Sequence, residues 1–331
     1  MNKKLSILKP EKSKEELKQE RLYSGDYVSF SKQFGTSLRG YQYTRTYSVA
    51  IDLFDVQKDK SSKVQFEAEV TIRKFPELGY YEYSIKKDNI FINKRYPKTL
   101  IEKLSVITSE VLYPLEVQTT LSNELLDIIN HKEILERWKK IKVQLQREYT
   151  GNAIDQYITK FEAKLHQKYR LLHSLNHEIF YTLLFQDIYT KYDDTLEKKA
   201  TINFPVLGFK TPINFKGNQK INKKKTYYNT ALACFESHIE SGATQATLNV
   251  ENDLDGNTFL LENIIAKCTI KNNKTVIKTV NASIYHLKEK PTIRRSFKEM
   301  RDDIRRRHRK IRKEKNKELT LKQRFIKWLD N

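Results

Sequence analysis

Alternating apolar and polar residues mark two stretches of the chain, one on each side of a central helical stretch. The clearest case is 66–73, where Phe66, Ala68, Val70 and Ile72 share one side and Glu67 begins the other. A period of two is typical of a half-buried β-strand. The same pattern and its turn residues predict further strands at 47–54, 79–85, 90–93, 115–121, 125–129, 246–250, 258–270 and 275–285.

Apolar residues change to a helical spacing between 131 and about 192. Ile134, Trp138, Ile141 and Leu145 fall on one helical face. Asn130 with a glutamate three residues later predicts a capping box at the start of this helix. We expect two or three antiparallel helices here, and a separate short helix at 99–111.

Strands on both sides of a helical stretch indicate an α+β fold. We expect an antiparallel sheet built from both flanks, an inserted helical hairpin or three-helix block, and a basic C-terminal helix. The predicted boundaries are a charged N-terminal arm at 1–25, a core at 26–290 and the basic helix at 291–331. Within the core, strands occupy 26–130 and 201–287 and helices occupy 131–192.

Positive charge is concentrated in residues 288–331. This segment has 18 Lys or Arg against 7 Asp or Glu, a net +11 of the chain's +21. Such a run predicts an anionic partner or an acidic protein surface, because it raises the local potential without forming a core. The predicted anion contacts are Arg294, Arg295, Arg301, Arg305, Arg306, Arg307, Arg309, Lys310, Arg312 and Lys313.

A narrow apolar seam accompanies these charges. The predicted partner-docking residues are Phe297, Met300, Ile304, Phe325 and Trp328. Three modes remain open: the helix docks by its seam on a protein, lies along nucleic acid, or rests on anionic lipid. We expect the first, which makes the protein a non-enzymatic adaptor of a larger complex. A non-specific nucleic-acid-binding protein is the alternative, and an anionic membrane surface ranks below both.

No set of residues converges on a catalytic pattern. His166, His173 and His177 have spacings of 7 and 4, but no second metal motif accompanies them, so we interpret them as surface histidines. P-loop, Rossmann and nucleophile-elbow patterns are absent from the sequence. We therefore predict that the chain is not an enzyme and has no metal or cofactor, and the sequence identifies no small-molecule substrate.

Two groups of acidic residues and one group of tyrosines are interpreted as structural and not as functional sites. Asp253 and Asp255 begin like a calcium loop, but Ile264 occupies the position of the required glutamate, so we predict a turn. The strand carboxylates of Glu67 and its neighbour Glu69 should only solvate the sheet. Tyr80, Tyr81 and Tyr83 could stack nucleic-acid bases, although cross-strand packing is the commoner role of such residues.

Composition limits the cellular compartments in which we expect to find the protein. The sequence has no apolar run long enough to span a bilayer, no apolar segment typical of a secretory signal at its start, and only two cysteines. We therefore expect a cytoplasmic protein.

Three short stretches resemble a known pattern. They are Tyr113-Pro-Leu-Glu-Val117, Ile128-Ile-Asn130 and Glu133-Ile-Leu-Glu-Arg-Trp138. Together they resemble uncharacterised bacterial proteins in which a short hairpin leads into a tryptophan-bearing helix. Some of those proteins are similar to accessory components encoded beside contractile injection systems of the type VI secretion kind. The resemblance implies a bacterial cytoplasmic protein and assigns no functional residue.

Overall fold

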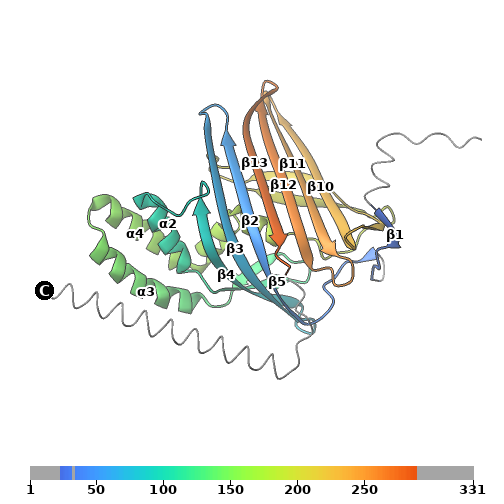
Figure 1. Ribbon diagram of the computed structural model, residues 1–331, viewed down its shortest axis with the longest axis horizontal. Coiled ribbons are helices and arrows are strands. Elements are labelled where there is room, and N and C mark those ends of the chain that lie inside the picture. The colour runs from blue at the N-terminus through green and yellow to red at the C-terminus, as the bar shows by residue number, and fades with distance from the viewer. Residues whose placement is uncertain (1–22, 32–33, 289–331) are drawn as a thin grey trace, which may run out of the picture. The chain divides into compact units, whose positions relative to one another are not determined.

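A computed structural model describes residues 23–31 and 34–288, and its elements belong to the compact unit Met1–Leu287 (Figure 1). The strands are β1 (Tyr23–Tyr27), β2 (Gln42–Asp55), β3 (Lys60–Phe75), β4 (Tyr80–Ile92), β5 (Leu115–Thr120), β6 (Leu125–Ile128), β7 (Glu197–Phe204), β8 (Ile213–Ile221), β9 (Lys224–Thr226), β10 (Thr230–Ser241), β11 (Thr244–Asp255), β12 (Leu261–Asn272) and β13 (Thr275–His286). The helices are α2 (Leu100–Glu110), α3 (His131–Glu148), α4 (Asn152–Leu165), α5 (Lys168–Leu175) and α6 (Ile179–Leu184).

One antiparallel sheet of 11 strands dominates the described residues. Its order is β6-β5-β4-β3-β2-β13-β12-β11-β10-β8-β7, and β1 pairs with β9 in a separate two-stranded sheet. The junction between the two halves of the chain is the pairing of β2 with β13, in which Asp55 lies opposite Lys278 and Tyr47 opposite His286. The first long strand and the last therefore meet at the centre of the sheet.

The α+β prediction is wrong. The fold is mostly antiparallel sheet, with 49% of the described residues in strands and 22% in helices, and it lacks the typical balance of sheet and helical block. The strands are longer than their apolar segments: β3 runs for 16 residues, although its buried positions extend only from Phe66 to Ile72. An antiparallel strand can carry Lys, Ser, Glu and Asn on its solvated face. A strand can therefore continue beyond the point where the alternation of apolar and polar residues ends. Strands β8 and β10 were not predicted for the same reason.

The inner face of the sheet packs around α6 and the segment that follows it. Phe180 of α6 meets Phe66 of β3 with ring centroids 5.3 Å apart, and Phe185 meets Tyr83 of β4 at 5.2 Å. Helical structure ends at Leu184, although helix was expected to about 192. Residues 185–192 have no regular helix because their aromatic side chains fill the interior, where burial and not helix periodicity decides the conformation.

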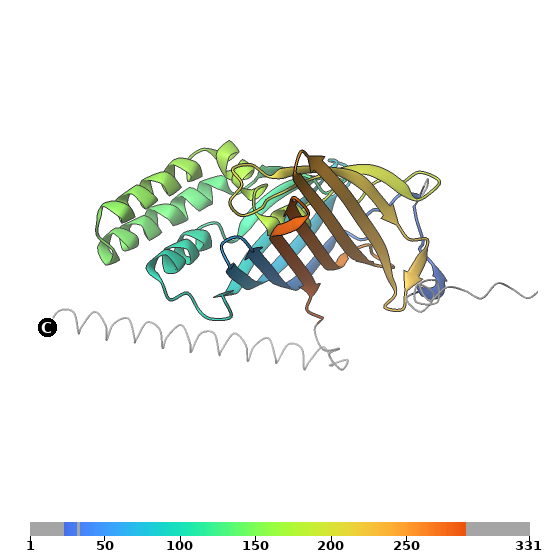
Figure 2. The same cartoon turned by 90° about the horizontal axis from the view of Figure 1, so that it is seen from above.

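The sheet curls until its two edges come close. Leu125 of β6 and Thr201 of β7 line one cavity of about 280 Å³, together with Tyr181 and Phe185 of the inner segment. The amino group of Lys198, on β7, binds the Asp187 carboxylate at 2.8 Å in this region. Helices α2, α3 and α4 lie outside the curl, on the side of β4 (Figures 1 and 2).

The capping box predicted at Asn130 is also wrong. The Asn130 side chain makes no cap hydrogen bond to α3. Its Oδ1 accepts from the backbone N–H of Glu116 at 3.0 Å and its Nδ2 donates to the Pro114 carbonyl at 2.7 Å. The asparagine thus joins the start of β5, which lies between β4 and the edge strand β6, to the start of the helix, because two partly buried backbone groups there need partners. Trp138 is buried in the helical layer, as its spacing predicts.

Candidate functional site

A pocket opens on the inner face of the sheet, at the tips of the long hairpins. Leu53 of β2, Val280 of β13, and Val206 and Leu207 of the β7–β8 loop supply its apolar wall. Its volume is about 340 Å³, at the lower end of the range of ~300–1,000 Å³ for small-molecule sites. We call this cavity the hairpin pocket. It lies where β2 and β3 extend past their buried positions, which end at Ile51 and begin at Phe66.

The loop between β7 and β8 forms one side of the hairpin pocket. The backbone N–H of Phe209 donates to the Val206 carbonyl at 3.1 Å, which closes a tight turn around Leu207 and Gly208. Gly208 has φ +87, a left-handed conformation that disfavours side chains. A Cβ at this position would also lie 3.0 Å from Nζ of Lys278. The positive φ favours glycine at this position, and Leu207 beside it is 64% exposed.

Lys278 and Asp55 form an ion pair in the pocket. Nζ of Lys278 lies 2.9 Å from Oδ2 of Asp55 and donates to the Leu207 carbonyl at 3.0 Å. The hydrogen bond from this ammonium lowers the pKa of Asp55, and the bond from the Lys58 backbone N–H adds to the effect. The two side chains are each 17% exposed, so the pair lies at the boundary between the interior and solvent.

The pocket is cationic overall. Lys58 and Lys60 also line it, so three lysines stand against the single carboxylate of Asp55. An ammonium has three N–H donors, and the two hydrogen bonds of Lys278 leave the third available to a ligand. An apolar wall beside convergent cations suits a molecule with a hydrocarbon body and an anionic group.

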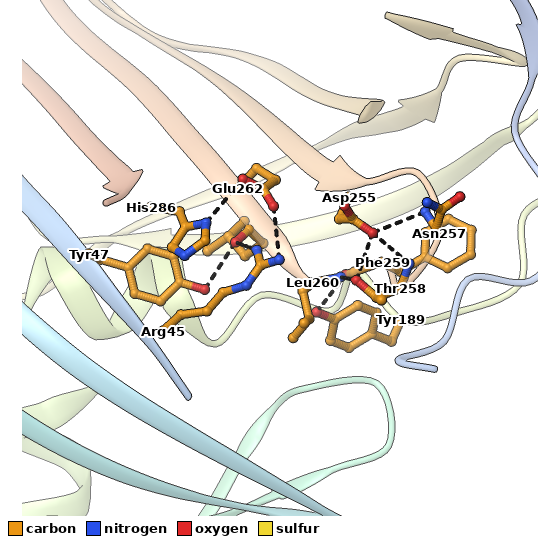
Figure 3. Close-up of polar contacts among 11 residues, drawn as sticks. Arg45, Tyr47, Tyr189, Asp255, Asn257, Thr258, Phe259, Leu260, Glu262 and His286 are labelled. Atoms are coloured by element: carbon orange, nitrogen blue, oxygen red, sulfur yellow. Dashed lines mark hydrogen bonds and ion pairs between the residues drawn. The ribbon is translucent and has the colours of Figure 1, made fainter. Parts of the chain in front are cut away.

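Polar side chains contact one another at the opposite end of β2 and β13, where β12 begins, which we call the closed end (Figure 3). The guanidinium of Arg45 lies 2.8 Å from the Glu262 carboxylate, and His286 Nδ1 lies 3.2 Å from the same group. Arg45 also donates to the Leu261 carbonyl at 2.7 Å, and the hydroxyl of Tyr47 donates to it at 3.0 Å. Burial raises the pKa of Tyr47 strongly, so this hydroxyl stays protonated as a donor.

A turn after β11 completes this closed end. Oδ1 of Asp255 accepts from the N–H of Asn257 at 3.1 Å and from the N–H of Thr258 at 2.7 Å. These bonds lower the pKa of Asp255 against the opposing effect of its burial, and they confirm the predicted turn. The hydroxyl of Tyr189 donates to the Phe259 carbonyl at 3.0 Å (Figure 3). The side chains here satisfy one another and the backbone, which makes the cluster a structural closure.

A third surface combines tyrosine and lysine at β1 and β9. Tyr27 of β1 is 60% exposed, and Tyr227 and Tyr228, directly after β9, are 63% and 85% exposed. Nζ of Lys223 lies 5.6 Å from the ring centroid of Tyr27, within the range of a cation–π contact. Lys224 is exposed on the adjacent strand. We call these five residues the basic tyrosine patch.

The predicted contact residues of the C-terminal helix lie outside the described residues. They are Phe297, Met300, Ile304, Phe325 and Trp328 for docking, and Arg294, Arg295, Arg301, Arg305, Arg306, Arg307, Arg309, Lys310, Arg312 and Lys313 for anions. Among the residues that are described, no group of three or more His, Cys, Asp or Glu is arranged to hold a metal ion.

Several other residues that the sequence singled out have structural contacts. The rings of His173 and His177 are 4.1 Å apart, and Nδ1 of His177 bonds the His173 carbonyl. Tyr81 and Tyr83 are buried in the core, so the idea that they stack bases is wrong. Alternate residues of β4 face the interior, and Tyr81 and Tyr83 are among them. The lysines next to them in sequence gave no sign of which residues face inward. Glu69 pairs with Lys86 at 2.7 Å on the outer face.

Sequence reasoning missed the hairpin pocket. Leu53, Lys60 and Lys278 lie on three different strands whose alignment depends on the pairing of β2 with β3 and β13. One local signal was present, since a glycine between two prolines at 205–212 predicts a sharp turn. What that turn faces could not be known without the sheet order.

The comparisons with known proteins identify no family. No protein-family model matches the chain, and no curated protein matches it. Among solved structures, a lipovitellin structure titled for its lipid–protein interactions aligns with 78% of this chain and 26% of its own, at 8% identity and a TM-score of 0.42. The chain thus spans about a quarter of that protein. The likeness is too low to transfer fold or function. In the part of the chain that is described, no helix combines the length and apolarity needed to cross a membrane.

Proposed function

We propose that the chain is a non-enzymatic binding protein that takes an amphipathic anion in the hairpin pocket. The ligand class is a carboxylate, or a similar anionic group, on a short hydrocarbon chain. The observation that supports this proposal is the convergence of Lys58, Lys60 and Lys278 on a pocket walled by Leu53, Val280 and the β7–β8 loop. The predicted role of an adaptor for a larger complex, through residues 288–331, remains a separate proposal.

The physical basis is a division of the ligand between two environments. Its chain replaces water against apolar side chains, which contributes about 25 cal/mol per Å² of apolar surface buried. Its anionic group meets ammonium groups that already face the opening, so little reorganisation is needed. Lys278 is held in place by Asp55 and by the Leu207 carbonyl, which orients its remaining donor.

Isothermal titration of the full chain with decanoate tests this function. We expect saturable binding near one equivalent and weaker binding of 1-decanol, which has the chain without the charge. Lys58→Glu/Lys60→Glu should raise the Kd by about tenfold, the equivalent of 1.4 kcal/mol. Ser62→Phe, which places a ring in the pocket, should abolish binding without loss of the folded state.

The matched control is Lys160→Glu/Lys164→Glu, which makes the same charge change at two exposed positions of α4. Decanoate should bind this variant as it binds the parent chain. If Ser62→Phe binds decanoate normally, or if the control weakens binding as much as the pocket variant, the hairpin pocket is not the site.

The basic tyrosine patch supports a second candidate function, the binding of single-stranded nucleic acid. Exposed rings of Tyr227 and Tyr228 can stack on bases while Lys223 and Lys224 meet phosphates. Base stacking contributes about 1–3 kcal/mol per base, so Tyr228→Ala should lower the affinity for an oligonucleotide by fivefold or more. Fluorescence anisotropy of labelled single-stranded and duplex oligonucleotides checks this, and Tyr169→Ala on α5 is the exposed-tyrosine control. Equal loss in both variants, or no loss in either, excludes the patch.

A further inference from the structure

The exposed apolar side chains around the hairpin pocket form a surface of their own. Phe54 and Leu207, which line the pocket, are 43% and 64% exposed, and Val56 and Phe209 beside them are 54% and 43% exposed. We call these four residues the hairpin rim. They come from two segments far apart in sequence, the tip of β2–β3 and the β7–β8 loop, that meet at the opening.

Both segments of the hairpin rim are held against β13. The backbone N–H of Val56 donates to the Ile277 carbonyl at 2.9 Å, which ties the β2–β3 tip to β13. Nζ of Lys278, also on β13, lies 5.9 Å from the ring centroid of Phe209 and bonds the Leu207 carbonyl. Strand β13 therefore connects both apolar segments, and Figure 1 shows the tips of β2–β3 and β12–β13 at the same end of the sheet.

Lysines lie next to the hairpin rim along the chain. Lys58 and Lys60 follow Val56, Lys210 follows Phe209, and Lys274 lies in the β12–β13 turn. The opposing carboxylates on these segments are Asp59 and Asp55, and Asp55 is already paired with Lys278. The surface is therefore cationic around exposed apolar side chains.

We infer that the hairpin rim docks on an anionic lipid bilayer. The inference extends the proposed function and depends on it in one respect, because a rim seated in the membrane would let an anionic amphiphile enter the hairpin pocket directly from the lipid. Apolar side chains flanked by lysines match the bilayer interface, where acyl chains lie below anionic headgroups. The lysines contact the headgroups, and the four apolar side chains enter the region beneath them.

A site-specific probe tests this docking without interference from the basic segment 288–331, which could hold the chain on anionic vesicles by itself. An environment-sensitive fluorophore is attached at Leu207→Cys in a Cys234→Ser background, and Cys268 is buried. The reference label is at Tyr169→Cys, an exposed position on α5. The vesicles contain phosphatidylcholine alone, or an equal mixture of phosphatidylcholine and phosphatidylglycerol.

We expect the label at residue 207 to shift to the blue on the mixed vesicles and not on phosphatidylcholine alone, while the label at 169 stays unchanged. Adding Lys58→Glu/Lys60→Glu should lower the apparent affinity of the label's response for the mixed vesicles by about fivefold or more for each charge. Lys160→Glu/Lys164→Glu should leave this affinity unchanged. A label at 207 that keeps its aqueous emission while the chain is bound to vesicles overturns the inference.

The two proposals fail in different ways. If decanoate binds in solution and the label at 207 does not respond, the pocket is filled from solution and the rim does not dock. If the label responds and Ser62→Phe has no effect on decanoate binding, the rim docks and the proposed ligand site is wrong.

Discussion

The two ends of the curled sheet share strands β2 and β13, but one end is closed by side-chain contacts and the other holds a pocket. At the closed end, β2, β12 and β13 contribute Arg45, Glu262 and His286, and the Glu262 carboxylate contacts both of the other two side chains. At the hairpin end, β2 and β13 extend past the filled interior together with β3. There Leu53 and Lys278 face a pocket.

The difference shows what decides whether a strand end is structural or available. Inner-face positions at the closed end meet residues 255–261, which bring Phe259 into the interior and supply backbone carbonyls to the polar side chains. The β7–β8 loop at the other end offers a turn and exposed apolar side chains. The two ends differ in whether a segment of the chain fills the interior beside the strands, and not in the residue types on the strands.

The largest expected effect contrasts one phenylalanine from each end. Phe259→Ala should lower the free energy of unfolding by about 3–5 kcal/mol, because its ring is buried and leaves a cavity. Phe209→Ala at the hairpin rim should cost about 0.5 kcal/mol or less, because that ring is 43% exposed. Urea denaturation of both variants measures the difference, and similar losses would mean that the hairpin end is as tightly packed as the closed end.

A smaller effect should follow from removing a charge. Glu262→Gln should destabilise the fold by about 2 kcal/mol, because it weakens the charged hydrogen bond with Arg45, where the two side chains are 11% and 13% exposed. The matched exposed pair is Glu69 with Lys86, and Glu69→Gln should cost about 0.5 kcal/mol or less. A cost for Glu69→Gln that equals that for Glu262→Gln would contradict the structural role assigned to the closed end.

The smallest expected effect concerns pH at the hairpin pocket. The Lys278 ammonium lowers the pKa of Asp55 in the folded state, so the pair stabilises the fold above the unfolded pKa of about 4. That stabilisation is lost as the pH falls through the folded-state pKa. Urea midpoints of the parent chain and Asp55→Asn should therefore differ near neutral pH and converge in acid. A difference that grows as the pH falls would reverse the sign and refute the ion pair.

Local patterns predicted some features of this fold correctly. The buried set Phe66, Ala68, Val70 and Ile72 confirms the period-two interpretation of β3. The short helix expected at 99–111 is α2, and Thr99 and Glu102 form its capping box. These features depend on neighbours a few residues away, which sequence spacing reports directly.

The remaining features depend on pairings between distant segments. Lys278 is one of many lysines in the sequence, and only its position opposite Asp55 on β2 brings it into a pocket. The ammonium of Lys87 lies 4.5 Å from the ring centroid of Phe66 and 4.8 Å from that of Tyr181, beside the Glu178 carboxylate. No sequence window contains these partners together, which is also why the α+β assignment failed.

The pairing of β2 with β13 has a consequence for how the chain reaches its native state. Asp55 and Lys278 are separated by 223 positions, so the sheet cannot close at its centre until almost all of the described strands exist. Sheets joined by such distant contacts form slowly and leave strand edges uncovered in the meantime. We therefore expect β2 and β3 to leave the ribosome long before β13 is made. Until then the edge of β2 that pairs with β13 stays exposed, which favours binding by chaperones.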